Sequence, residues 1–222
     1  MIEGIAVRVH SCHRTECSIE GIADMSTHSL RQGIQHVQIA LRDPEEFAVR
    51  WQSGQAAYPW WVWGSLFGTA MLGTLSYGLT MGLLGGPDQM VRKALLCTFC
   101  AGIAWGLPLP ALYILNSLNG SRLKASSTLL AAMVTTSWGG LAMVASIPIN
   151  WFLTAAVPHP GFVLAVNLGV FSGVGIAMTD TFARVMHRLE PERPAAPIWW
   201  IMLVALTGSE LFYFVGLFQF GV

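Results

Sequence analysis

Five long runs of apolar residues, separated by short polar connections, make up most of the chain after residue 55. Each run reaches the length of about 20 residues that an α-helix needs to cross the hydrocarbon core of a bilayer. Connections this short place neighbouring helices antiparallel in one bundle. The pattern therefore predicts an all-α fold, a polytopic membrane bundle of about five transmembrane helices in one domain (56–222), with spans at residues 60–84, 94–118, 128–153, 161–183 and 198–218.

The tail before the first span (1–55) has a different pattern. Over part of it, apolar residues recur at helical spacing beside polar ones, as in a helix that lies on a membrane surface; they are Leu30, Ile34, Val37 and Leu41. We expect an amphipathic cytoplasmic helix here, and a partly disordered tail is the alternative. Residues 1–24 have no clear periodicity, so we expect them to be disordered or untranslated, with Met25 rather than Met1 as the start.

A second short amphipathic helix is predicted directly before the first span. Asp43 suits its N-cap and Pro44 its first helical position, while Glu46 stands where a capping-box side chain returns to the N-cap N–H. Gly54 should end this helix because glycine adopts the left-handed conformation found beyond helix ends.

Composition favours the predicted membrane location, and the charged residues indicate which side of the membrane the N-terminus occupies. Hydrophobic residues make up 54% of the chain and charged residues 11%, against roughly 25% charged in a soluble domain. The net charge is zero, so we expect no nucleic-acid partner. The first 55 residues contain no signal-peptide pattern, which predicts a cytoplasmic N-terminus.

Basic residues agree with that orientation, because Lys and Arg near helix ends are retained in the cytoplasm. Arg92 and Lys93 alone fall in a connection predicted to be external. The other ten are predicted to be cytoplasmic: five Arg in the tail, Arg122 and Lys124 in the second connection, and Arg184, Arg188 and Arg193 in the fourth. The C-terminus is then external.

Acidic residues within the spans are candidates for function. Glu210 lies near the middle of the fifth span, where a carboxylate usually indicates a partner, a relay or a cavity. Two hypotheses stand: a structural hydrogen bond, or an ion or proton pathway. The expected partner is the polar Asn150, Asn167 or Thr207, or water in a crevice. Asp180 lies near the end of the fourth span and can pair with Arg184 one turn later.

Small residues recur every four positions and can let helices approach closely. They are Gly64/Gly68 and Gly78/Gly82 in the first span, and Ala165, Gly169, Gly173 and Ala177 in the fourth. We expect these faces to pack inside the bundle, with self-association through the fourth span as the alternative. Pro108 and Pro110 should interrupt the second span and Pro148 the third.

Signatures of catalysis and of cofactor binding are missing from the sequence. The spans contain no His pair, and the chain has no HExxH, phosphate-binding loop or Gly-x-Ser-x-Gly motif. Cys97 and Cys100 lie one turn apart, but nothing at a usable spacing completes a metal site. We therefore expect no catalytic residue, no cofactor and no metal, and a protein that is not an enzyme.

Residues 107–123 (LPLPALYILNSLNGSRL), followed by Ser146-Ile-Pro-Ile149, resemble the bacterial relatives of the Yip family. The resemblance implies five spans, a cytoplasmic N-terminal tail and the bacterial cytoplasmic membrane. Eukaryotic Yip proteins are associated with small GTPases, vesicle trafficking and membrane curvature. Within the motif, Asn116, Asn119 and Gly120 are predicted to form a helix cap and turn, and Arg122 to meet lipid headgroups.

Three functions are compatible with the sequence. The leading hypothesis is a non-enzymatic, Yip-like membrane protein that organises the membrane or partner proteins, with lipids, other membrane subunits or a second copy as partners. The second is a channel or transport subunit whose pathway includes Glu210. The third is an accessory subunit of a larger membrane complex.

Overall fold

The computed structural model describes residues 35–55, 58–118, 120–192 and 198–218, which are helical or lie in turns between helices, without a β-strand. The predicted all-α fold is confirmed over these residues. After helical residues 35–42, the elements are α2 (Pro44–Gln52), α3 (Trp60–Met81), the short 3₁₀ helix η1 (Leu83–Gly85), α4 (Pro87–Gly106), α5 (Pro108–Leu118), α6 (Ala125–Ala156), α7 (Pro160–Leu189) and α8 (Ile198–Phe214).

Three helical segments in the described part of the chain are long and apolar enough to cross a membrane: Pro87–Leu118, Ala125–Ala156 and Pro160–Leu189. A shorter apolar helix covers Met202–Phe214. The helix α3 has 22 residues and is outside this set. Membrane-spanning capacity is thus confirmed for the second, third and fourth predicted spans.

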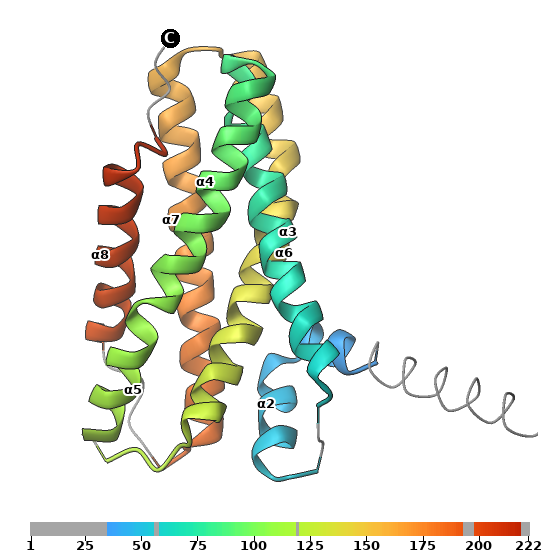
Figure 1. The fold of residues 1–222 in the computed structure, drawn as a ribbon, viewed down its shortest axis with the longest axis vertical. Coiled ribbons are helices and arrows are strands. Elements are labelled where there is room, and N and C mark those ends of the chain that lie inside the picture. The colour runs from blue at the N-terminus through green and yellow to red at the C-terminus, as the bar shows by residue number, and fades with distance from the viewer. Residues whose placement is uncertain (1–34, 56–57, 119, 193–197, 219–222) are drawn as a thin grey trace, which may run out of the picture.

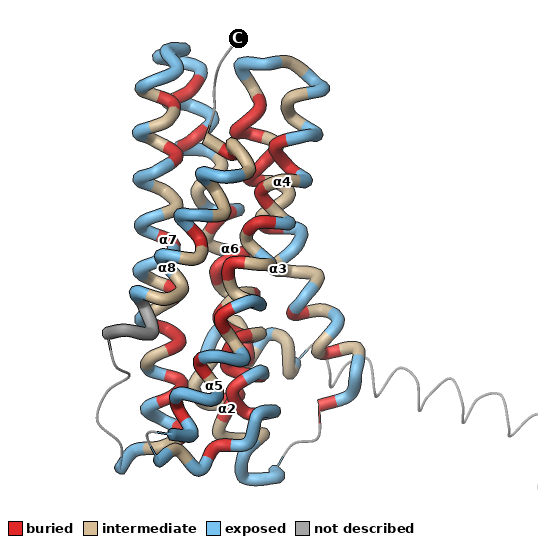
Figure 2. The backbone as a smooth tube through the Cα atoms, turned by 60° about the vertical axis from the view of Figure 1, so that its left-hand side comes forward, coloured by how far each residue is buried: buried red, intermediate tan, exposed pale blue. Residues whose placement is uncertain are grey.

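The long helices run side by side along the long axis of the molecule (Figure 1). The helix α3 packs against α4 and α6, α6 packs against α7, and α8 packs against α4 and α5. At one end α2 lies against α6 and α7, and the turn between α3 and α4 lies at the other end. Figure 2 shows buried positions along the inner sides of the helices and many exposed positions on their outer sides.

Prolines interrupt a helix at one of the two predicted places. The second span divides at Leu107, because α4 ends at Gly106 and Pro108 begins α5, as predicted. The third span does not divide, because α6 continues through Pro148 as one helix of 32 residues. The prediction of an interruption there is wrong, since a helix this long can lose the hydrogen bond that proline removes and still continue.

The start of α2 follows the sequence in part. Asp43 caps the helix by accepting a hydrogen bond of 3.0 Å from the Glu46 N–H, and Pro44 occupies the first turn, as predicted. The predicted return bond from the Glu46 side chain is wrong. Helical residues 35–42 provide an acceptor instead, because the Asp43 N–H donates to the Ile39 carbonyl at 2.7 Å, while the Glu46 carboxylate pairs with Arg50 at 2.8 Å.

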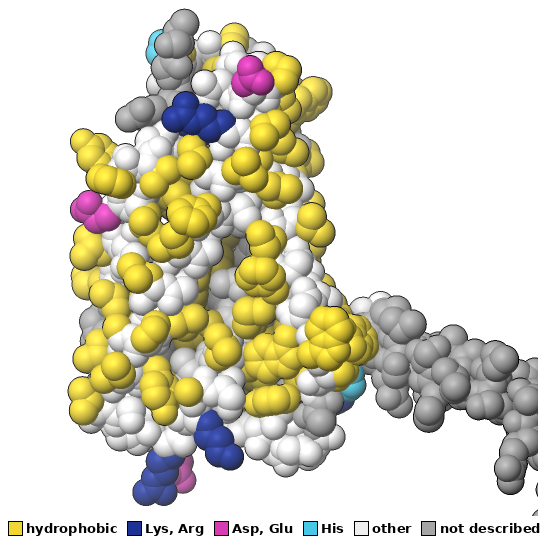
Figure 3. Space-filling view, viewed as in Figure 1, with side chains coloured by type: hydrophobic (Ala, Val, Ile, Leu, Met, Phe, Trp, Pro, Cys, Tyr) yellow, Lys and Arg dark blue, Asp and Glu magenta, His cyan; other side chains and the backbone are white. Residues whose placement is uncertain are grey.

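The surface of the bundle is apolar over most of its length. Figure 3 shows hydrophobic side chains over the middle of one face and most of its charged side chains near the two ends. Large hydrophobic side chains that are strongly exposed include Phe99 (64%), Ile176 (72%) and Phe214 (89%). A surface of this kind suits hydrocarbon better than water.

Candidate functional site

Glycines bring α3 into backbone contact with α6 and α4 in the upper part of the bundle as drawn in Figure 1. A Cβ placed on Gly73 would lie only 2.1 Å from the Gly140 carbonyl oxygen of α6. A Cβ on Gly78 would lie 2.6 Å from the Cα of Ala94 in α4. Glycine is therefore required at these crossings, and Gly78 fulfils the packing role predicted for it.

A cluster of buried polar side chains joins α3, α6 and α7 beyond this crossing. The Tyr77 hydroxyl donates to Asn167 Oδ1 at 2.9 Å, and Asn167 Nδ2 donates to the Val163 carbonyl at 2.8 Å. Asn150 Nδ2 donates to Thr80 Oγ1 at 2.9 Å, while the Thr80 hydroxyl donates to the Tyr77 carbonyl at 2.6 Å. Because each donor is satisfied inside the bundle, we name these four side chains, Tyr77, Thr80, Asn150 and Asn167, the polar clasp.

Lys93 fastens α8 to α4 at the same end. Its side chain is buried, and its ammonium group donates to the carbonyls of Gly216 at 3.0 Å and of Leu217 at 2.5 Å. Gly216 has a positive φ of 67°, and the turn it forms after α8 directs these carbonyls toward α4. The sequence places Lys93 in an external connection. That position is corrected, because α4 begins at Pro87 and already contains Lys93.

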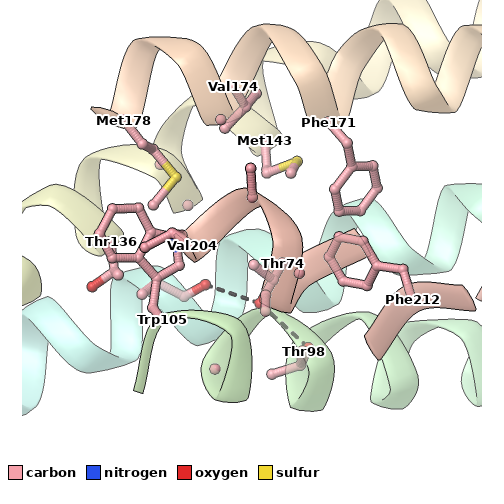
Figure 4. Close-up of a pocket in the computed structure, with 18 of the residues that line it drawn as sticks. Thr74, Thr98, Trp105, Thr136, Met143, Phe171, Val174, Met178, Val204 and Phe212 are labelled. Carbon is pink, nitrogen blue, oxygen red and sulfur yellow. Dashed lines mark hydrogen bonds between the residues drawn. The ribbon is translucent and has the colours of Figure 1, made fainter. Parts of the chain in front are cut away.

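Next to the contact between Gly73 and Gly140, the helices separate around a cavity of about 1040 Å³, lined by residues from α3 to α8, Gly140 and Gly216 among them. Figure 4 shows side chains from several helices converging on it, and Figure 3 shows the face of the molecule hollowed near its middle. The lining is mainly apolar and includes Trp105, Met143, Phe171, Met178, Val204 and Phe212. No charged side chain is among the described residues that line it.

Five hydroxyl groups in the cavity wall are bonded to the protein itself. The Thr74 hydroxyl lies 3.0 Å from the Ala70 carbonyl and 3.4 Å from the Thr98 hydroxyl, and the Thr98 hydroxyl donates to the Ala94 carbonyl at 2.9 Å. Thr136, Thr179 and Ser209 likewise donate to carbonyls of their own helices. These donors are therefore not available to orient a polar ligand, and the wall is suited to an apolar one.

The end of the bundle that carries α2 is held by charged side chains. Glu190 accepts hydrogen bonds of 2.8 Å from the Ser121 hydroxyl and from the Arg122 N–H, and so ties the end of α7 to the turn before α6. Arg184 pairs with Asp180 at 3.0 Å, as predicted, and with Glu45 of α2 at 3.0 Å. Glu190 could not be identified from the sequence, because its partners lie about 70 positions away along the chain.

Tyr58 fixes α2 against the start of α3. Its hydroxyl donates to the Phe47 carbonyl at 2.9 Å, and its ring stacks on the Phe47 ring at 4.0 Å between centroids. Burial raises the pKa of Tyr58 to about 12, because the ionised phenolate loses hydration there. The helix α2 is therefore attached to the bundle through a packed aromatic contact as well as through surface ion pairs.

The turn after α5 has the predicted cap. The Gly120 N–H donates to the Ser117 carbonyl at 3.0 Å and the Ser121 N–H to the Asn116 carbonyl at 3.1 Å, with Gly120 at a φ of 86°. These two bonds form a Schellman motif and confirm the cap predicted for Asn116 and Gly120. Asn119 is outside the described residues. Arg122 is exposed at this turn, and its contact with lipid headgroups remains a prediction.

Glu210 is exposed on α8 and has no hydrogen bond or ion pair within the described part of the chain. The partners considered for it are bonded elsewhere: Asn150 and Asn167 belong to the polar clasp, and Thr207 donates to the Leu203 carbonyl at 2.8 Å. The predicted hydrogen bond to one of them is therefore wrong, because Glu210 lies on the exposed side of α8, away from the buried polar groups.

The predicted packing of four glycines inside the bundle is also wrong. A Cβ on Gly64, Gly68, Gly169 or Gly173 would meet no atom within 4 Å. Spacing alone identifies a small-residue face but not the direction in which it points. The self-association predicted for α7 remains open, since Gly169 and Gly173 face outward.

Cys97 and Cys100 are buried free thiols. In the described part of the chain, no three His, Cys, Asp or Glu side chains are grouped so that they could hold a metal ion. Comparison with known proteins finds no matching family model, no matching curated protein and no matching solved structure.

Proposed function

We propose that this chain is an integral protein of the bacterial cytoplasmic membrane that crosses the bilayer five times, with α3 and α8 spanning beside the three longer apolar segments. This proposal rests on where the apolar and polar side chains lie. Large apolar side chains cover the outside of the bundle and the polar clasp is buried, which is the opposite of a protein that folds in water. Lipid accommodates such a surface, and buried polar pairs then help to hold the helices together.

The proposed orientation has α2 in the cytoplasm and the C-terminus outside. It is supported by the position of the basic residues, because α2, the end of α7 and the turn before α6 meet at one end of the bundle. Described basic residues on these segments are Arg50, Arg122, Lys124, Arg184 and Arg188, and Arg42 lies just before α2. Retention of such residues on the cytoplasmic side gives this orientation.

Within the membrane, the proposed role is that of a non-enzymatic organising protein, in line with the Yip-like resemblance. Its partner is another membrane helix, from a second copy or from another subunit, docked on the outward face of α7. Gly169 and Gly173 support this role because open space lies above both, so a partner backbone can approach closely. Exposed Leu168 and Ile176 flank that face and add apolar contact.

Gentle solubilisation of the tagged protein, followed by native mass spectrometry, tests this role. We expect a stoichiometric second copy or foreign subunit that is lost from the Gly169→Leu/Gly173→Leu variant, because the new side chains keep the partner backbone away. The matched control is Gly64→Leu/Gly68→Leu, which enlarges an equally open face on α3 and should keep the partner. A monomer in all three proteins would contradict the organising role.

Insertion in the membrane is tested separately by washing native membranes at alkaline pH. The proposed protein stays with the lipid, since its apolar surface needs hydrocarbon. Release into the wash would contradict the membrane proposal itself, whatever partners are found.

A further inference from the structure

We infer that the cavity among α3, α4, α6, α7 and α8 is a binding site for the acyl chains of a membrane phospholipid, which enter sideways from the bilayer. This inference rests on the proposed membrane location. It assigns a ligand to the apolar cavity, whose wall includes Leu168 and Ile176 at the edge of the α7 face proposed for a partner.

The position of the cavity favours a ligand that comes from the hydrocarbon core. Its wall uses residues 98–109, 129–143 and 164–179, which lie within the three membrane-length segments and include the middle of each. Exposed side chains belong to the same wall, among them Phe67 and Met71 on α3 and Ile176 on α7. The cavity is therefore open toward the surroundings of the helices at the depth where lipid chains are found.

Water is a poor occupant of this space. A buried water needs two to four polar partners, but the hydroxyls of Thr74, Thr98 and Thr136 are already bonded to the protein. No charged side chain lines the cavity among the described residues. An empty cavity is also unfavourable, because its apolar wall would lose dispersion contacts. Hydrocarbon provides those contacts without requiring hydrogen bonds.

The volume of the cavity and the side chains of its wall suit flexible acyl chains. Its volume of about 1040 Å³ lies at the upper end of ligand sites, which usually measure about 300–1,000 Å³. Met143 and Met178 contribute adaptable thioether side chains to the wall. Gly102, Gly106 and Gly175 leave open space where other residues would carry a side chain. A wall of this kind selects by shape and apolarity rather than by directed polar contacts.

The glycines of the wall allow the cavity to be filled without a clash. In a Gly102→Phe/Gly175→Phe variant the new rings enter it from α4 and α7, because nothing lies within 4 Å of either Cβ position. The matched control, Gly64→Phe/Gly68→Phe, adds the same rings at open positions of α3 outside the cavity wall. Circular dichroism and thermal unfolding in detergent verify that both variants fold like the parent.

The test is lipid retention. Each protein is reconstituted with phosphatidylglycerol and phosphatidylethanolamine, extracted into detergent, washed and analysed by native mass spectrometry. We expect phospholipid in stoichiometric amount on the parent and on the control, and its loss from the cavity-filled variant. Equal retention by all three proteins, or none by the parent, would overturn the inference, as would a quinone or other isoprenoid in place of phospholipid. Failure of the membrane proposal is distinguishable, since such a protein would not reconstitute at all.

Discussion

The two ends of the bundle use the same helices but pack them differently. In the half of the bundle away from α2, glycines allow α3 to touch α4 and α6, and the polar clasp and Lys93 connect the helices. Beside these contacts an apolar cavity, whose wall includes Gly140 and Gly216, lies between the helices, and α3 and α4 separate toward the α2 end (Figure 1). Hydroxyl groups occur in both regions, but in the cavity wall they bond mainly to their own helices. The polar clasp joins helices in the half of the bundle where α3 comes into backbone contact with its neighbours.

The largest expected effect comes from a side chain at the closest crossing. Gly73→Ala should lower the free energy of unfolding by about 3 kcal/mol or more, because the new methyl group meets backbone rather than a side chain that can move. Thermal unfolding in detergent provides the measurement. Gly68→Ala on the same helix is the control, and it should be neutral or stabilising by up to about 1 kcal/mol. Equal stability of both variants would mean that the backbone contact at Gly73 does not require glycine.

Removing the Lys93 ammonium group should loosen α8. We expect Lys93→Met to cost about 1.5–3 kcal/mol, because the carbonyls of Gly216 and Leu217 lose a charged donor. Hydrogen exchange in α8 should accelerate while exchange in α3 and α6 stays as in the parent. Arg92→Met, at an exposed neighbouring position, provides the control. If the two variants gave the same exchange pattern, Lys93 would not fasten α8.

Within the polar clasp, Asn167→Leu should cost about 1–3 kcal/mol, because the buried Tyr77 hydroxyl is left without its acceptor. Tyr77→Phe combined with Asn167→Leu should recover part of that loss, since two apolar groups then face each other. A double-mutant cycle on thermal unfolding measures the coupling. Zero coupling would mean that close packing alone holds this end together.

The smallest expected effect concerns Tyr58 at the α2 end. Its pKa is raised to about 12, against about 10 in an unfolded chain, so the folded state favours the protonated form. The stabilisation is fully present below about pH 10 and is lost as the pH rises through about 12. Tyr58→Phe should remove this dependence and cost about 1 kcal/mol of hydrogen bonding to Phe47. Absorbance titration of both proteins isolates the Tyr58 ionisation, and a midpoint near 10 would contradict its burial.

Features that depend on neighbouring residues in the chain could be predicted from the sequence. Apolar runs gave the helices of the bundle, and local signals gave the Asp43 cap, the break at Pro108 and the Gly120 turn. Each of these depends on residues close together in the chain. The start of α4 was placed too late because Arg92 and Lys93 were treated as part of a connection.

Contacts between distant segments could not be predicted. The sequence suggests Asn150 and Asn167 as partners of Glu210, but their actual partners, Thr80 and Tyr77, lie 70 and 90 positions away. Whether a glycine face points into the bundle depends on how each helix is rotated about its axis. The cavity depends on how far the helices move apart along their length. These features follow from packing among all the helices, which spacing within one helix does not determine.

The most direct test of this account is the accessibility of a spin label inside the cavity. The label is attached at Gly102→Cys in a protein whose native cysteines are replaced, and the protein is reconstituted in bilayer nanodiscs. If hydrocarbon fills the cavity of a membrane-embedded bundle, oxygen will relax the label strongly and a water-soluble nickel chelate will do so weakly. Strong relaxation by the nickel chelate would mean that water reaches the cavity, and would contradict the account.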